Sequence, residues 1–272
     1  MVEIAAFSRY NNVISLCNLL ELGAQAVGQV VVVTSGKGGT GKTTLCAAIA
    51  SCLAAEGSQV LCIDADVGLR NLDLSLGMAD CAVISFEDVM AGLSPLSDAA
   101  TSHSISGLSL LTAPLNTAPE ALNPAAFGAL IDQARMQYDW CLIDAPAGIG
   151  AGFRLASQFA DLAIVVSTAD PASLRDASRT ADLLEQLGVA ESKLVVNRVT
   201  PKLYQQMSTT IDDIMDVVGL PLLGIVPDDY HVPLASSAGV PLVLHTNQGA
   251  AEACLHLARR LCGKKAPLLR LK

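Results

Sequence analysis

Gly36-Lys37-Gly38-Gly39-Thr40-Gly41-Lys42-Thr43 is the stretch that decides the fold of this chain. It fits the pattern G-x-x-x-x-G-K-[ST], whose glycines let the backbone wrap around a polyphosphate with its N–H groups turned inward. We expect Lys42 to reach the β- and γ-phosphates and the Thr43 hydroxyl to ligate Mg²⁺, with Thr44 following in the first turn of a helix. Lys37 adds a second positive charge directly after the first glycine.

The segments that flank this loop have the character that a phosphate loop requires. Val30 to Thr34 is an unbroken run of β-branched residues, which is typical of a strand buried on both faces. Thr44 to Glu56 is rich in helix formers and contains neither Gly nor Pro. The order strand, glycine loop, helix therefore favours a nucleotide site over a chance glycine-rich turn.

Composition limits the classes of protein that remain. The chain has 272 residues, of which 51% are apolar and 16% charged, and its net charge is −9. Broad DNA binding is not expected of so acidic a chain, because such binding relies on Lys and Arg. No apolar stretch approaches the roughly 18 residues of a membrane span. The eight cysteines are scattered without a C-x-x-C pair and the first residues lack the features of a secretory signal, which together indicate a cytoplasmic protein.

Apolar strand candidates alternate with helical patterns along the chain. The expected strands after the first are 59–64, 108–112, 140–144, 162–168, 193–197 and 222–226, and the expected helices are 44–56, 124–137, 152–159, 172–187, 209–218 and 248–261. This alternation predicts an α/β fold, with a mostly parallel sheet covered by helices on both faces in three layers. We expect a single domain over 29–263, preceded by an extension of unknown role (1–28) and followed by a short basic tail (264–272).

Carboxylates follow two of these strands, where parallel sheets bind ligands. Asp64 and Asp66 end the second strand and point the same way, so Asp66 is expected to position an attacking water while Asp64 supports the metal or the loop. Asp144 ends a later strand and is expected to meet Mg²⁺ through water. The turn after it, with Pro146 and Gly148, is expected to sense the γ-phosphate.

Two further positions are candidates for contact with the base. Asn197 ends the strand 193–197 and offers one donor and one acceptor, although a turn-forming Asn is an equal alternative from this position alone. Pro227 follows the last strand and is expected to flank the base. The four histidines show no metal-ligand spacing.

Taken together, these motifs resemble the ParA/MinD family of deviant Walker A ATPases, in the SIMIBI class of P-loop proteins. The loop with its extra Lys37 resembles the family's signature, and Asp64-Ala-Asp-Val-Gly-Leu-Arg-Asn-Leu-Asp73 is similar to switch I of the MinD branch. Asp144-Ala-Pro-Ala-Gly-Ile149 resembles its switch II, and similar runs occur at 169–176 and 224–229. The switch residues that the resemblance implies are Asp64, Asp66, Gly68, Arg70, Asn71, Asp73, Asp144, Pro146 and Gly148.

The resemblance, which spans 29–263, implies an ATP-dependent dimer that acts in division-site selection. Lys37 would cross the dimer interface to touch the partner's ATP, and hydrolysis to ADP and phosphate would reset the switch. The implied partners are a division inhibitor (MinC-like), an activator (MinE-like) and the inner face of the membrane. The tail, however, is short and contains Pro267, unlike the amphipathic tails of MinD proteins.

Alternative readings share the same chemistry. A ParA-type partition ATPase would act on DNA, which the acidic balance disfavours, and a flagellar-number regulator related to MinD would carry most of these motifs. A nucleotide-binding scaffold without turnover is disfavoured because Lys37, Lys42, Asp66 and Asp144 are all present.

Overall fold

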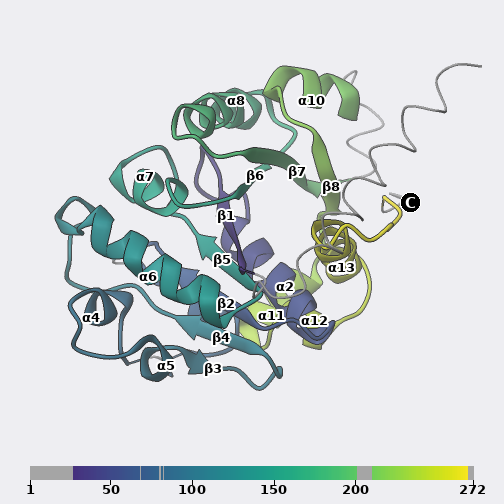
Figure 1. Cartoon of the computed structure of the whole chain (residues 1–272). Coiled ribbons are helices and arrows are strands. Elements are labelled where there is room, and N and C mark those ends of the chain that lie inside the picture. Colours follow the sequence, from purple (N-terminus) through teal and green to yellow (C-terminus); the bar gives the residue numbers. More distant parts are fainter. Residues whose placement is uncertain (1–26, 68, 80, 82, 201–209, 269–272) are drawn as a thin grey trace, which may run out of the picture.

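An eight-stranded sheet forms the centre of the described molecule (Figure 1). The computed structural model describes residues 27–67, 69–79, 81, 83–200 and 210–268. The strand order is β3-β4-β2-β5-β1-β6-β7-β8, and every pair is parallel except β3 with β4. The predicted strand that precedes the glycine loop, β1, therefore lies at the middle of the sheet between β5 and β6.

The bounds of the elements follow the predicted ones closely. The strands are β1 Gln29–Thr34, β2 Val60–Asp64, β3 Thr101–Ser102, β4 Leu108–Leu111, β5 Trp140–Asp144, β6 Leu162–Ser167, β7 Glu191–Val199 and β8 Leu222–Pro227. The longer helices are α2 Lys42–Ala55, α6 Pro124–Gln137, α7 Ala151–Ser157, α8 Pro171–Gln186, α10 Ile211–Val218, α11 His231–Ser237 and α13 Ala250–Leu261. Short helices are α3 Leu72–Ser75, α4 Phe86–Met90, α5 Leu96–Ala99, η1 Pro119–Ala121 and α12 Leu242–His245.

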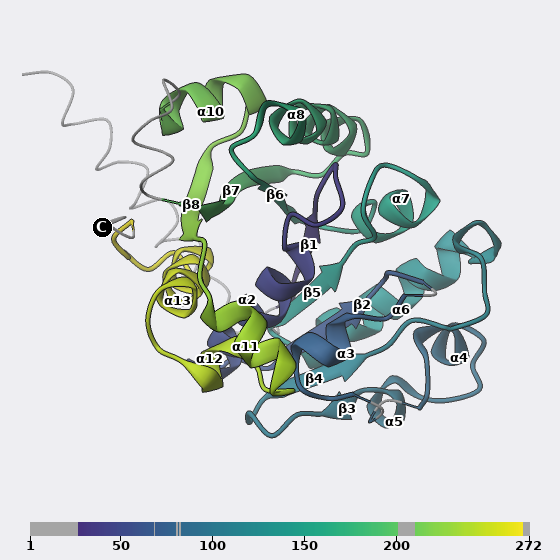
Figure 2. The same ribbon diagram turned by 180° about the vertical axis from the view of Figure 1, so that it is seen from behind.

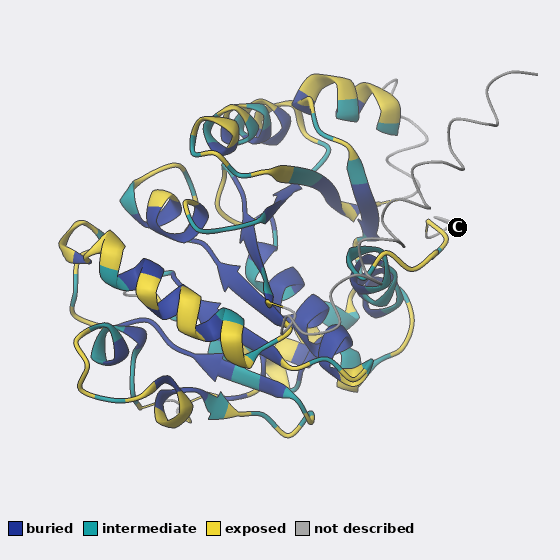
Figure 3. Ribbon diagram, in the orientation of Figure 1, coloured by how far each residue is buried: buried dark blue, intermediate teal, exposed yellow. Residues whose placement is uncertain are grey.

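The predicted three-layer α/β/α arrangement is confirmed, since helices cover both faces of the sheet (Figures 1 and 2). In β1, Val31 and Val33 belong to a buried cluster that includes residues of α2, α3, α11, α12 and α13, whereas Val30 and Val32 belong to the cluster on the other face, which includes residues of α4, α5, α6, α7, α8 and α10. Figure 3 shows the buried strands between half-exposed helices such as α6. Because side chains alternate along a strand, β1 is buried on both faces, as its β-branched run predicts.

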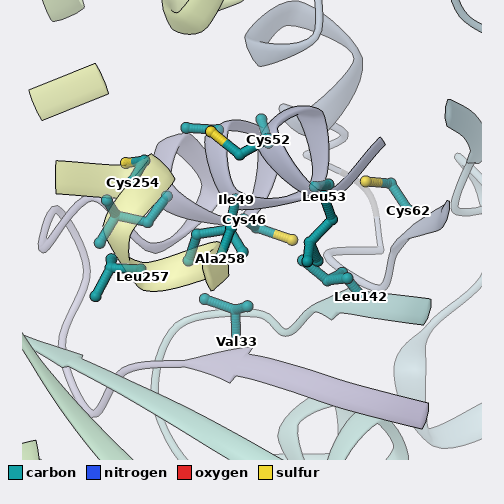
Figure 4. Packing of buried hydrophobic residues seen from close by; sticks show 14 of the residues in the cluster. Val33, Cys46, Ile49, Cys52, Leu53, Cys62, Leu142, Cys254, Leu257 and Ala258 are labelled. Carbon is teal, nitrogen blue, oxygen red and sulfur yellow. The ribbon is translucent and has the colours of Figure 1, made fainter. Parts of the chain in front are cut away.

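Small side chains let α2 pack closely against the sheet and against α13, which lies beside it on the same face (Figure 4). Cys46 and Ile49 of α2 lie in one buried cluster with Cys254 of α13 and Val33 of β1. The described cysteines are free thiols, five of them buried. Burial raises the pKa of the Cys52 thiol to about 12, so it stays protonated and behaves as a small apolar side chain.

The C-terminal segment, from α13 onward, is held against α2 and β8 by hydrogen bonds and ion pairs. Lys264 and Arg259 each place a nitrogen 2.7 Å from the carboxylate of Glu56, which caps the end of α2. Arg260 donates to the carbonyl of Leu223 on the edge strand β8 and to the carbonyl of Ala266. Residues 264–268 form no helix. Among the described residues, none of the helices combines the length and apolar character that a bilayer crossing needs.

Several predicted features differ from the structure or lie outside it. The strand β3 and the helices α3, α4, α5, η1, α11 and α12 were not predicted, because each has seven residues or fewer and is too short to show a periodic pattern. Most of the predicted N-terminal extension (1–26) and the end of the tail (269–272) lie outside the described residues, as does Gly68.

Candidate nucleotide-binding site

The glycine loop connects β1 to α2 at the carboxyl edge of the sheet, where the sequence predicts it. Gly39 and Gly41 adopt φ angles of 79° and 91°, which other residues rarely reach. At Gly36, a Cβ atom would lie 2.4 Å from the carbonyl oxygen of Asp176, so only glycine allows the loop to pass α8. Gly41 caps α2 without a side-chain hydrogen bond. The first N–H groups of α2 therefore remain for an anion.

Lys42 lies in the interior of this site. Its side chain is 9% exposed, and its Nζ atom is 3.5 Å from Oδ1 of Asp144 and 4.0 Å from Oδ2 of Asp66. The same nitrogen is 3.4 Å from the hydroxyl oxygen of Thr43. Three of the predicted site residues, Thr43, Asp66 and Asp144, thus lie around the buried ammonium group of Lys42.

Asp144 is the carboxylate that fits a metal ion best. It is almost fully buried, and its Oδ2 atom has no hydrogen-bond partner among the described residues. Burial raises its pKa to about 7, although Lys42 and the Thr43 hydroxyl act in the opposite direction. An unpartnered carboxylate oxygen beside a hydroxyl offers the oxygen ligands that Mg²⁺ prefers. No group of three or more His, Cys, Asp or Glu side chains that could hold a metal by itself occurs in the described part of the chain.

Asp64 holds the segment that follows β2. Its Oδ1 atom accepts a hydrogen bond from the backbone N–H of Asp66 (2.9 Å), and its Oδ2 atom accepts one from the N–H of Leu72 (3.1 Å). Burial raises the pKa of Asp64 to about 6 despite these two hydrogen bonds. Of the two predicted roles for this residue, the contacts favour support of the loop over support of the metal.

The other switch residues lie along the same loop and the turn after β5. Arg70 has a φ angle of 44°, Asn71 caps α3 and Asp73 lies in its first turn. In the turn after β5, the N–H of Gly148 donates to the carbonyl of Ser35, 3.2 Å away. Both predicted switch segments therefore border the site.

Lys37 lies at the surface of the loop, in contrast to Lys42. Its side chain is 49% exposed, and its Nζ atom is 3.7 Å from Oδ1 of Asp170. Asp170 caps α8 by accepting the N–H of Ser173, and a hydrogen bond from Thr168 contributes most to lowering its pKa. Sequence reasoning did not assign this partner to Lys37, although Asp before Pro171 is a recognisable helix start.

A cavity of about 470 Å³ opens beside the loop, between α2, the end of β8 and α11. Gly41, Asn197 and Pro227 line it, so the two residues predicted to contact the base border the same cavity. The remaining wall includes residues that belong to no sequence motif: Leu45, Tyr230, Val232, Pro233, Ser236 and Leu242. Figure 2 shows α11 and α12 beside α2 on this side of the molecule. These residues lie in or next to α2, α11 and α12, and only the folded chain brings them together.

Asn197 faces the loop as well as the cavity. It is buried, and its Nδ2 atom donates a 2.7 Å hydrogen bond to the carbonyl of Thr40. The donor that was predicted to read a base is therefore engaged by the loop. No hydrogen bond reaches its Oδ1 atom from the described residues.

The buried carboxyl groups predict a pH-dependent stability of the ligand-free protein. Since the pKa of Asp144 is raised to about 7, from 3.8, the folded state binds more protons than the unfolded state between these values, and stability falls as pH rises through this range. The Asp144→Asn variant does not titrate. Its free energy of unfolding relative to wild type should therefore rise by about 1–3 kcal/mol between pH 5.5 and 8. Urea denaturation of both proteins at each pH measures this difference in the free energy of unfolding.

The exposed Asp182 of α8 provides the matched control for this prediction. The Asp182→Asn variant should keep a constant difference from wild type over the same pH range. A constant difference for Asp144→Asn as well would show that Asp144 is ionised at pH 5.5 in the folded protein.

Comparison with known proteins places this site in a family. The model of the CobQ/CobB/MinD/ParA nucleotide binding domain matches residues 31–242. The chain is 39% identical to a septum site-determining protein MinD of Synechocystis sp., over 89% of this chain and 92% of the relative. Among solved structures, it is similar to MinD in the MinC:MinD cell division protein complex of Aquifex aeolicus, with 36% identity, a TM-score of 0.82 and coverage of 89% and 99%.

A second solved structure carries a ligand. MinD of Pyrococcus horikoshii, complexed with Mg-ADP, is 29% identical, with a TM-score of 0.76 and coverage of 86% of this chain and 96% of that one. The resemblance seen in the sequence is confirmed. These likenesses agree with the site itself, where the loop carries two lysines and buried carboxylates surround one of them. The chain therefore belongs to the MinD/ParA family of nucleotide-binding proteins, as a MinD-like P-loop ATPase.

Proposed function

We propose that this MinD-like ATPase acts in division-site selection as a switch that dimerises with ATP and separates after hydrolysis. The observation that carries the proposal is the different location of the two lysines of the loop. Lys42 is buried among carboxylates inside the site, whereas Lys37 is half-exposed at the surface of the same loop. A cation at the surface is available to the phosphates of a second subunit, in the manner of an arginine finger supplied in trans.

Within one subunit, each side chain has a role that its contacts support. The loop N–H groups and Lys42 bind the triphosphate, and Thr43 and Asp144 would hold Mg²⁺, Asp144 through water. Mg²⁺, when bound, neutralises charge that develops on the phosphates. Asp66 is half-buried 4.0 Å from Lys42 and would position the attacking water. Asp64 holds the backbone of Asp66 in place through the 2.9 Å hydrogen bond.

The base would occupy the cavity beside the loop, between Asn197 and Pro227. The Mg-ADP complex of the archaeal relative supports ADP as the product form and Mg²⁺ as the metal.

The partners follow from the family. The complex of MinC with MinD in Aquifex aeolicus supports a MinC-like division inhibitor as a partner. A MinE-like activator and the inner face of the cell membrane, reached from the cytoplasm, are further proposed partners. Direct anchoring to the membrane by the tail has less support than the other proposed interactions. Residues 264–268 form no helix, and Lys264 is paired with Glu56.

The oligomeric state of a hydrolysis-deficient variant tests the switch. The Asp66→Ala variant should bind Mg-ATP without turning it over, because nothing then positions the water. It should therefore stay a dimer of about twice the 28.1 kDa chain mass with ATP and a monomer with ADP, as measured by light scattering.

The Asp98→Ala variant, which removes an exposed carboxylate of α5, is the control and should hydrolyse ATP at the wild-type rate. A single-chain mass for Asp66→Ala saturated with ATP would refute the dimerisation switch.

A further inference from the structure

A β-bulge interrupts the pairing of β7 with β8 next to the nucleotide site. Val196 pairs with Ile225 and Val199 with Pro227, so three steps along β7 correspond to two along β8. Arg198 lies in this interval with a φ angle of 55°, which is rare for a residue with a side chain. Such bulges re-aim side chains and recur beside active sites.

The side chain next to this irregularity is that of Asn197, and it reaches across the fold to the glycine loop. Its Nδ2 atom donates to the carbonyl of Thr40 over a distance of 2.7 Å, between residues 157 positions apart in the chain. A Cβ atom on Gly41 would lie 2.4 Å from this nitrogen, so the close approach requires glycine there. The contact is buried, with Asn197 6% and Thr40 3% exposed.

The hydrogen bond fixes the orientation of one peptide unit of the loop. In a planar trans peptide, the C=O of Thr40 and the N–H of Gly41 point in opposite directions. Because the Asn197 amide holds the carbonyl on its own side, the N–H of Gly41 is turned away from Asn197. Gly41 caps α2 and precedes Lys42, so the orientation of this peptide sets the start of the phosphate-binding helix.

We propose that Asn197 is a positioning residue for the phosphate loop, acting through the Thr40 carbonyl. In this proposal, the bulge at Asn197 and Arg198 directs the Asn197 side chain toward the loop. The proposal deepens the proposed nucleotide binding and rests on it. It predicts that Asn197 contributes to affinity for the phosphate chain itself, independently of the base. A residue that only reads the base would contribute nothing when the ligand has no base.

Two variants separate these two roles: Asn197→Asp keeps the shape of the side chain and replaces the donor by an acceptor, and Asn197→Leu removes the donor at similar volume without adding a negative charge. With Mg²⁺ present, calorimetry of both variants should show about 10- to 100-fold weaker binding of ATP and, equally, of inorganic tripolyphosphate, since the buried Thr40 carbonyl loses its partner. The loss in Asn197→Asp relative to wild type should shrink as pH is lowered, because a protonated carboxyl group can donate to Thr40 again.

A pair of variants tests the bulge separately. Arg198→Gly and Arg198→Val both remove the guanidinium group, but only glycine adopts a φ angle of 55° without strain. Arg198→Val should therefore bind tripolyphosphate at least about 5-fold more weakly than Arg198→Gly, because straightening β7 re-aims Asn197.

The outcomes distinguish this inference from the proposed function. Loss of ATP affinity in Asn197→Asp with unchanged tripolyphosphate affinity would overturn the positioning role and assign Asn197 to the base. Equal affinities of the two Arg198 variants would overturn the role of the bulge. Wild-type protein that binds tripolyphosphate but not ATP would refute the proposed function, while the tripolyphosphate measurements would still decide the role of Asn197. Wild-type protein that binds neither would refute both.

Discussion

ATP binding should be lost when Lys42 is replaced by alanine. The Lys42 ammonium is the buried cation of the site, 3.5 Å from Asp144 and 4.0 Å from Asp66. Without it, a bound triphosphate would face these two carboxylates without the lysine charge, and each lost hydrogen bond between charged groups costs about 1.5–3 kcal/mol. The dissociation constant for Mg-ATP should therefore rise by at least about 100-fold, as measured by calorimetry.

The Lys193→Ala variant is the matched control for this experiment. Lys193 pairs with Glu191 at the start of β7, at the edge of the sheet away from the loop, and such partly exposed pairs contribute little. Its removal should leave ATP affinity unchanged. Wild-type affinity in the Lys42→Ala protein would show that the nucleotide binds elsewhere.

Replacement of Lys37 by alanine should separate binding from dimerisation. Lys42 and the loop N–H groups remain, so ATP should still bind to single chains. The charge that we propose reaches a second subunit is gone, so ATP-dependent dimers should be absent in light scattering, and phosphate release should fall by about 1,000-fold or more.

Stability provides the control for this variant. The pair that Lys37 makes with Asp170 is exposed, with a nitrogen–oxygen distance of 3.7 Å, and exposed pairs contribute about 0–1 kcal/mol. The Lys37→Ala protein should therefore unfold within about 1 kcal/mol of wild type. ATP-dependent dimers of normal strength in this variant would exclude the role in trans.

The fold could be predicted from the sequence wherever burial leaves a long pattern. The run before the glycine loop and Trp140–Asp144 are buried on both faces, and such strands appear as continuous apolar segments whose ends are marked by a polar residue. The loop motif and the carboxylates that follow the strands could be predicted for the same reason, because strand ends place them at one edge of the sheet.

The remaining features depend on contacts between distant segments. The part of the cavity wall that α11 forms carries no motif, and only the folded chain places it beside the glycine loop and the start of α2. The engagement of the Asn197 donor by Thr40 depends on a bulge that a strand pattern does not reveal. The pairing of Lys37 with Asp170 joins residues 133 positions apart (170 − 37), and spacing in the sequence carries no information about it.

The alignment of β2 with β5 has a consequence for how the chain tolerates changes of length. Asp64 and Asp144 are direct neighbours across these parallel strands. A single residue gained or lost inside either strand would turn its terminal carboxylate to the opposite face, because side chains alternate. The turns that enter the strands, such as Gly57 to Gln59, lie at the other edge and carry no such restriction. An insertion at that edge, whether gained in evolution or as a fused reporter domain, would leave the register of the two carboxylates unchanged.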